Sequence, residues 1–230
     1  MNDAVAVVAC AVLGLVVGWL LDPVITRVPA PVLGPPEPDT HVPRSDVRRV
    51  VVTIVCGALF GAMGARFADS WALPAYLVLT AGLVALAAID LETYLLPNRL
   101  VYPLTFATLA LLGVASLGDG DGAAYVRGLV VGAIAWTVFF IMNFVAPRAM
   151  GFGDVRLSFT LGLSLGWLGW GVGFVGFFLS FLLGSVVGVA LIAFRLRSRK
   201  DHVPFGPFLV AGTLTAILIG ADIVSWYLGT

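Results

Sequence analysis

The sequence predicts an all-α membrane protein, a polytopic bundle of about eight transmembrane helices with both termini outside the cytoplasm. Three observations predict this fold. Hydrophobic residues make up 60% of the 230 residues and charged residues only 11%, which is not the balance of a water-soluble domain. Long apolar runs recur along the chain and end at Pro, Gly or charged residues. Lys and Arg gather in alternate loops.

The apolar runs give eight expected spans. They cover residues 4–21, 48–65, 73–90, 98–117, 125–146, 154–170, 171–194 and 205–228. The boundary between the sixth and seventh spans is the least well defined, because Gly162, Gly166 and Gly169 disfavour a regular helix there. Those two could therefore form a short hairpin in place of two full crossings. The other glycines suit close packing of helices in lipid.

We interpret residues 1–230 as a single transmembrane domain with one long loop at 22–47. That loop holds seven prolines, too many for a helix, and it has too few residues to fold alone. We expect it to be extended and cytoplasmic.

The distribution of basic residues predicts the orientation in the membrane. Loops after the first, third, fifth and seventh spans hold eleven of the thirteen basic residues, and the opposite side holds only Arg66 and Arg127. Because cytoplasmic loops retain Lys and Arg, these four loops should face the cytoplasm. We therefore expect a multi-pass protein of the cytoplasmic (inner) membrane of the cell.

Several function classes are disfavoured by composition. The net charge is zero and no basic stretch with interleaved aromatics occurs, so we expect no nucleic-acid partner. Cys10 and Cys56 lie in apolar runs without a CxxC pair or a nearby His, so we expect no metal site, no cofactor and no disulfide. A removable signal peptide is not expected either, because the first residues include no basic region.

Two carboxylates interrupt the end of the third apolar run. Asp90 and Glu92 are followed by Pro97, which cannot continue a helix, and by Asn98, which can cap the next one. Charge at this place needs a partner or a water-filled cavity. A second break, Met-Gly-Phe-Gly-Asp at 150–154, puts Asp154 at the start of the sixth span. The two breaks fall in the loops after the third and fifth spans, which are expected to be cytoplasmic. Both aspartates should therefore lie at the cytoplasmic face.

Two facing aspartates suggest a carboxylate pair that shares one proton, as in aspartic proteases. One member takes a proton from water and the other donates one, without a metal. The helix ends predict that Asp90 holds the proton and that Asp154 is the base. Gly151 and Gly153 permit positive φ and leave room for an extended peptide to approach Asp154, so we take them as candidate substrate-binding residues.

Each of these residues also has a plainer interpretation. Asp154 alone could be the N-cap of the sixth span, and Asp90 alone an interfacial charge that ends the third. Glu92 could be a solvated loop residue instead of a docking site for a basic substrate segment. For Asp22, at the end of the first span, a role in the helix end is the better interpretation. The joint presence of Asp90 and Asp154 on one predicted face weakens the plainer interpretations of both.

At these residues the chain resembles the prepilin leader peptidases, membrane aspartic peptidases that process type IV pilin-like precursors. Residues 89–92 and 95–98 form the first block of this resemblance and residues 151–157 the second. Residues 14–29 and 205–209 match more weakly, at the exit of the first span and the start of the last. The blocks lie in matching order along the whole chain.

The resemblance implies an eight-span bundle that cleaves at the cytoplasmic face, with Asp90 and Asp154 as the catalytic dyad. Cleavage would follow a short basic leader, typically behind a glycine, just before the hydrophobic helix of the substrate. Bifunctional members also methylate the new N-terminus and carry a cytoplasmic insertion with paired CxxC motifs, where this chain has only the Pro-rich loop. Residues 18–22 also depart from the family's usual Gly-Ser-Phe-Leu-Asn. We therefore expect the short, metal-free form without methyltransferase activity.

The sequence thus favours an aspartic endopeptidase of prepilin-like precursors, with lipid as its other partner. Pilin, pseudopilin and archaellin-like precursors stay open as substrates. One alternative is another Gly-x-Gly-Asp intramembrane peptidase that cuts within a helix, as presenilins do. A second is a small proton-coupled transporter that uses Asp90 and Asp154 as a relay. A transporter should show internal repeats and charges near the midplane, and neither is found.

Overall fold

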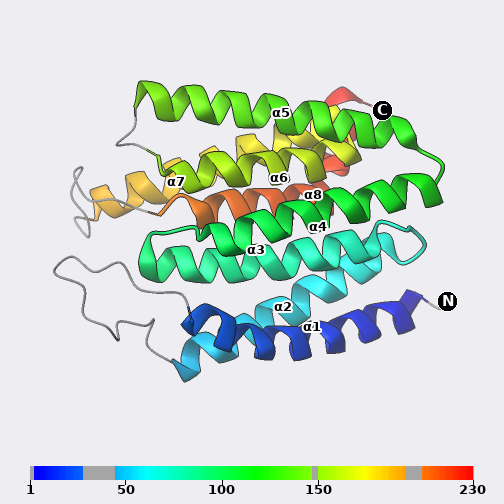
Figure 1. Cartoon of the computed structure of the whole chain (residues 1–230), viewed down its shortest axis with the longest axis horizontal. Coiled ribbons are helices and arrows are strands. Elements are labelled where there is room, and N and C mark those ends of the chain that lie inside the picture. Colours follow the sequence, from blue (N-terminus) through cyan, green and yellow to red (C-terminus); the bar gives the residue numbers. More distant parts are fainter. Residues whose placement is uncertain (1–2, 28–44, 147–149, 195–203, 230) are drawn as a thin grey trace. The chain divides into compact units, whose positions relative to one another are not determined.

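The computed structural model describes residues 3–27, 45–146, 150–194 and 204–229. In these ranges the chain forms eight helices and no strand (Figure 1). Their bounds are α1 Asp3–Thr26, α2 Asp46–Phe67, α3 Leu73–Thr93, α4 Asn98–Gly118, α5 Gly122–Val145, α6 Phe152–Leu168, α7 Trp170–Ala193 and α8 Gly206–Leu228. Seven of the described helices, all but α6, are long and apolar enough to cross a membrane. The predicted all-α, multi-span fold is confirmed.

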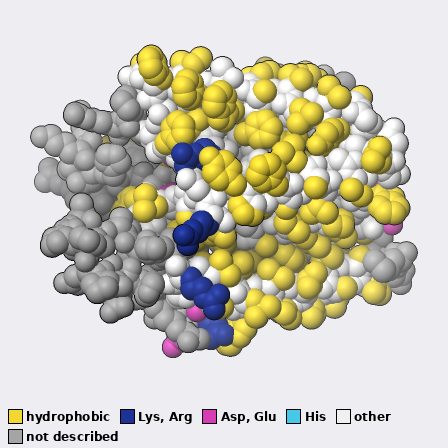
Figure 2. Space-filling view, viewed as in Figure 1, with side chains coloured by type: hydrophobic (Ala, Val, Ile, Leu, Met, Phe, Trp, Pro, Cys, Tyr) yellow, Lys and Arg dark blue, Asp and Glu magenta, His cyan; other side chains and the backbone are white. Residues whose placement is uncertain are grey.

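The exposed surface of the helices is that of a protein in contact with lipid. Hydrophobic side chains are spread over much of the described surface seen in Figure 2. Large apolar residues such as Leu117, Phe144 and Trp226 are about four-fifths exposed, at 86%, 79% and 83%. In water so much exposed apolar surface would be unfavourable, whereas in a bilayer it is expected.

The chain divides into two compact units, Met1–Gly122 and Ala123–Thr230. In the first unit α1 packs most extensively on α2, and α3 contacts α1, α2 and α4. Glycine permits the close approach of α1 to α2, because a Cβ at Gly14 would lie 2.5 Å from the carbonyl oxygen of Cys56. A real Cβ does not come this close to another atom, so a larger residue would push the helices apart.

A buried cluster in the first unit supports the end of α3. It joins the last turn of α1, the first half of α2 and the second half of α3 through Ile25, Val52, Cys56, Val84, Ala85 and Ile89. Ile25 and Ile89 are fully buried. The backbone that carries Asp90 therefore rests on a packed apolar base.

In the second unit α6 is the most buried helix. Most of its 17 residues are buried, and it contacts α7 and α8. It also packs closely on α5, where a Cβ at Gly132 would lie 2.9 Å from the carbonyl oxygen of Phe159. At about 1.5 Å per residue, α6 is about 26 Å long, shorter than the roughly 30 Å of a hydrocarbon core. The sixth and seventh predicted spans are separate helices joined at Gly169.

The first helix is longer than the predicted 4–21, because it continues through Pro23 to Thr26. Proline removes one helical hydrogen bond, but burial of Asp22 and Ile25, at 1% and 0% exposure, holds this turn in place. The loop expected at 22–47 is therefore helical at its start, and Asp46 already begins α2. Residues 28–44, which hold most of its prolines, lie outside the described part of the chain.

Candidate active site

Asp90 lies inside the last turn of α3, not at its end as the sequence predicted. The helix continues to Thr93 and is closed by Tyr94, whose left-handed backbone (φ 56°, ψ 27°) lets its N–H donate to the Asp90 carbonyl at 2.9 Å. The Thr93 hydroxyl donates to the Ile89 carbonyl at 2.8 Å. Asp90 is only 5% exposed. A carboxylic side chain is thus buried in a helical turn at the end of an apolar helix.

The turn after Asp90 differs from the prediction in one detail. Asn98 does not cap α4 and is instead its first residue. Pro97 holds the capping position with φ −70° and ψ 130°, and its carbonyl accepts from the N–H groups of Leu100 and Val101 at 2.9 and 3.1 Å. The fixed φ of proline suits this position, and no side chain caps α4.

Asp154 is the third residue of α6, not its N-cap. The N-cap is Gly151, whose carbonyl accepts from the Asp154 N–H at 3.1 Å. A Cβ on Gly151 would lie 3.5 Å from Asp154 Oδ2, so the carboxyl group lies close to the N-cap. Asp154 is 6% exposed. A negative side chain in the first turn interacts favourably with the helix dipole.

The glycines before Asp154 do not have the backbone that the sequence suggested. Gly151 has φ −71° and ψ 145°, which any residue can adopt. Among the described glycines, the left-handed backbone occurs at Gly120 (φ 70°) and Gly229 (φ 71°). A left-handed turn therefore does not explain glycine at 151, and a Cβ there would meet the Asp154 carboxyl group at an ordinary contact distance. Beside it, Phe152 is 45% exposed and stacks under the Arg156 guanidinium at 4.6 Å.

Side chains of α5 also donate hydrogen bonds to the backbone near both ends of α6. The side-chain amide of Asn143 donates to the Met150 carbonyl at 2.8 Å, one residue before Gly151. At the other end of α6, the Arg127 guanidinium donates to the carbonyls of Gly166 and Trp167 at 2.7 and 2.6 Å. Two side chains of α5 therefore bond to the backbone on either side of Asp154, one just before α6 and one in its last turn.

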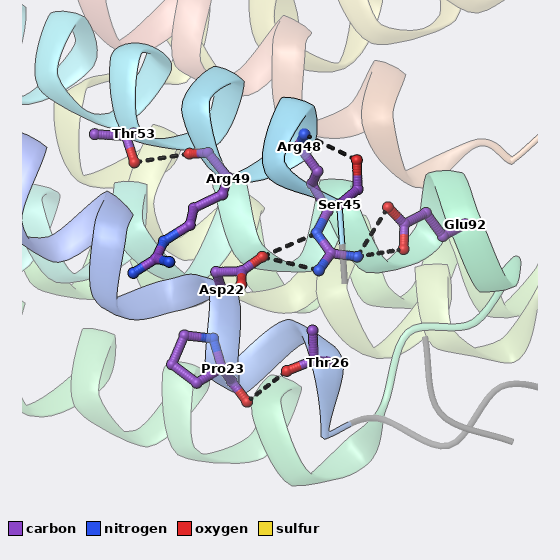
Figure 3. Close-up of polar contacts among 8 residues, drawn as sticks. All are labelled: Asp22, Pro23, Thr26, Ser45, Arg48, Arg49, Thr53 and Glu92. Carbon is purple, nitrogen blue, oxygen red and sulfur yellow. Dashed lines mark hydrogen bonds and ion pairs between the residues drawn. The ribbon is translucent and has the colours of Figure 1, made fainter. Parts of the chain in front are cut away.

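Glu92 and Asp22 meet at one arginine, Arg48 of α2 (Figure 3). Arg48 Nη1 donates to Glu92 Oε1 and Oε2 at 3.1 and 2.8 Å, while Nε and Nη2 donate to Asp22 Oδ1 at 3.2 and 2.8 Å. The side chains of Asp22 and Arg48 are 2% and 8% exposed, and that of Glu92 is 32% exposed. Glu92 is thus neither a fully solvated loop residue nor open on all sides to a substrate.

Sequence reasoning missed Arg48. Its partners lie 26 and 44 residues away, so no local spacing connects them. One signal was present. Arg48 and Arg49 lie in the first turn of a helix, where the dipole disfavours cations, so a nearby carboxylate was to be expected.

The two units each carry one of the predicted catalytic residues. The first holds Asp90 and Glu92 on one turn of α3, together with Asp22. The second holds Gly151, Gly153 and Asp154 at the start of α6. The pairing of Asp90 with Asp154 stays a prediction from the sequence.

The family model of the type IV leader peptidases matches residues 77–192, from α3 into α7. The chain belongs to this family. The matched region includes all five predicted site residues, Asp90, Glu92, Gly151, Gly153 and Asp154. Asp22 and Arg48 lie before it.

Three proteins similar to this chain are each named prepilin leader peptidase/N-methyltransferase. The chain is 34% identical over 183 residues to the protein of Stutzerimonas stutzeri, covering 79% of this chain and 62% of that one. Identity is 35% over 184 residues with the Aeromonas hydrophila protein (79% and 61%) and 33% over 183 residues with that of Pseudomonas aeruginosa (79% and 61%). The matched part is therefore a little over three-fifths of each relative. No solved structure matches the chain.

Proposed function

We propose that this protein is a membrane aspartic endopeptidase that removes the short basic leader from type IV prepilin-like precursors. One observation carries the proposal. Within the region matched by the family, two aspartates that are 5% and 6% exposed each lie at the end of an apolar helix. An acidic side chain in this position is energetically costly, and ionisable residues in membrane helices are characteristic of functional sites. Family membership favours a peptidase over the transporter relay.

The proposed reaction uses one proton shared between Asp90 and Asp154. The ionised carboxylate takes a proton from water, whose oxygen attacks the scissile carbonyl. The protonated carboxyl donates to the carbonyl oxygen, and a proton then passes to the leaving amine as the C–N bond breaks. The first turn of α6 favours a negative side chain and the last turn of α3 disfavours one, so Asp154 is the base and Asp90 the acid.

The substrate backbone approaches Asp154 over Gly151 and Gly153. The absence of a side chain at Gly151 leaves the space beside Asp154 Oδ2 that an extended peptide needs. Cleavage takes place at the cytoplasmic face of the cytoplasmic membrane. The mature N-terminus leaves as a free amine, since the sequence contains only Cys10 and Cys56 and no CxxC motif.

The test is cleavage by the purified protein in lipid vesicles. A precursor with a basic leader, a glycine and a hydrophobic helix is the substrate, and mass spectrometry locates the cut. Release of the leader after the glycine supports the proposal. Cleavage inside the hydrophobic helix would favour the presenilin-like alternative, and an intact precursor would refute the proposed activity.

A further inference from the structure

We propose that Arg48 is a positioning residue for Asp90, because it anchors the last turn of α3 to α1 and α2 through Glu92 and Asp22. The kinetic consequence of this anchor rests on the proposed peptidase function. Its structural consequence, the order of the last turn of α3, does not.

Arg48 connects three helices through one buried guanidinium. It projects from the first turn of α2 and contacts Asp22 near the end of α1 and Glu92 in the last turn of α3 (Figure 3). Four donor–acceptor distances of 2.8–3.2 Å use Nε, Nη1 and Nη2 at once. The planar fork of arginine presents these separate nitrogens to both carboxylates in fixed directions, which the compact ammonium group of a lysine does not.

The contact with Glu92 fixes the rotation of the turn that carries Asp90. Successive helical residues are about 100° apart, so Asp90 and Glu92 point about 200° apart around α3. Holding Glu92 against α2 therefore directs Asp90 to the opposite side of the helix. Ile89, fully buried in the cluster with Ile25 and Val52, supports the same rotation.

The contact also opposes fraying. The turn is the last of α3, and the N–H of Tyr94, a left-handed residue that is not glycine, closes it on the Asp90 carbonyl. Terminal turns open easily unless tertiary contacts hold them. Glu92 supplies such a contact two residues after Asp90.

This assignment gives Glu92 a role that differs from leader docking. Both of its carboxylate oxygens already accept from Arg48 Nη1. If Glu92 positions Asp90, its loss should lower kcat for every substrate. If it binds a basic leader, its loss should raise KM for basic leaders alone.

Arg48→Lys and Arg49→Lys form a matched pair for the test. Each keeps its positive charge, so Asp22 keeps a cation nearby and the fold is spared. Arg49 stacks over the Trp19 ring at 3.2 Å from the guanidinium carbon to the ring centroid, and it makes no contact with Glu92 among the described bonds. We expect Arg48→Lys to lower kcat about 10- to 100-fold with little change in KM, because small displacements of a catalytic group have large effects. Arg49→Lys should cleave like the wild type.

Glu92→Gln separates the two roles of Glu92. We measure it with a basic leader and with a leader in which Gln replaces the basic residues. An equal fractional loss of kcat on both substrates supports positioning. A KM increase confined to the basic leader would overturn it.

A second readout does not depend on cleavage. Thr93 is 2% exposed, so a cysteine placed there reports opening of the last turn of α3. In a Cys10→Ala, Cys56→Ala, Thr93→Cys background, Arg48→Lys should speed alkylation at least several-fold over Arg49→Lys. Equal alkylation rates would refute the anchor, and faster alkylation with unchanged kcat would refute its link to Asp90. If the wild type does not cleave, the proposed function fails while alkylation still decides the anchor.

Discussion

Substitution of Gly151 tests whether a substrate passes over the start of α6. The backbone at Gly151 suits any residue, and an added Cβ would meet Asp154 Oδ2 at 3.5 Å and the Gly153 nitrogen at 3.9 Å, which are ordinary contacts. The cost of Gly151→Ala to folding is therefore that of a poorer N-cap, about 1 kcal/mol. Gly151→Ser adds a hydroxyl that can cap α6, so its folding cost should be about zero.

The effect on cleavage should be much larger than the effect on folding. A Cβ at 151 occupies the space through which we propose that the peptide reaches Asp154. Both variants should then lose about 10- to 100-fold in kcat/KM, because a displaced peptide no longer aligns with the carboxyl groups. Cleavage kinetics and thermal unfolding in detergent measure the two effects separately.

The serine variant decides the interpretation. If Gly151→Ser cleaves like the wild type, the substrate does not need the space at 151. If only Gly151→Ala loses activity, the weaker N-cap of α6 explains the result. The proposal that the substrate peptide passes over Gly151 is then wrong. Gly188→Ala is the control, because a Cβ there meets nothing within 4 Å.

Three further predictions concern packing, orientation and the product. Gly14→Ala should destabilise the protein by about 1–3 kcal/mol in thermal unfolding, because the new Cβ would lie 2.6 Å from Phe60 Cβ; a stability equal to that of the wild type would mean that α1 and α2 can separate freely. A cysteine at Leu95, which is 47% exposed, should react with an impermeant reagent only from the cytoplasmic side, and one at Asp121 only from outside; the reverse pattern would invert the orientation. Mass spectrometry of the mature substrate should find a free N-terminal amine even with a methyl donor present, and a methyl group added by the purified protein would contradict this.

Sequence alone predicted the helices well, because long apolar runs punctuated by Pro and Gly leave few other choices in a membrane. Helix ends were less predictable. Pro23 suggested that α1 ended before it, yet the burial of Ile25 holds a further turn. Tyr94 closes α3 with a left-handed backbone that glycine usually supplies, so local preference gave no signal there.

The candidate site was predictable where its residues are local in sequence. Asp90 and Asp154 stand out because charge is rare in apolar helices. Their exact positions, in the last turn of α3 and the first turn of α6, depend on cap geometry. The sixth span was expected to start at Asp154, whereas Asp154 is the third residue of α6. The contacts of Arg48 could not be predicted from the sequence, because residues 22, 48 and 92 come together only when α1, α2 and α3 pack.

Cleavage by Asp90→Asn and Asp154→Asn tests the central claim most directly. Both substitutions keep the shape of the side chain and remove the acid, so each protein should reach normal levels in the membrane. We expect each variant to lose essentially all cleavage of a precursor that the wild type processes, because neither carboxyl group can act without the other. Substantial cleavage by either variant would contradict the two-aspartate mechanism.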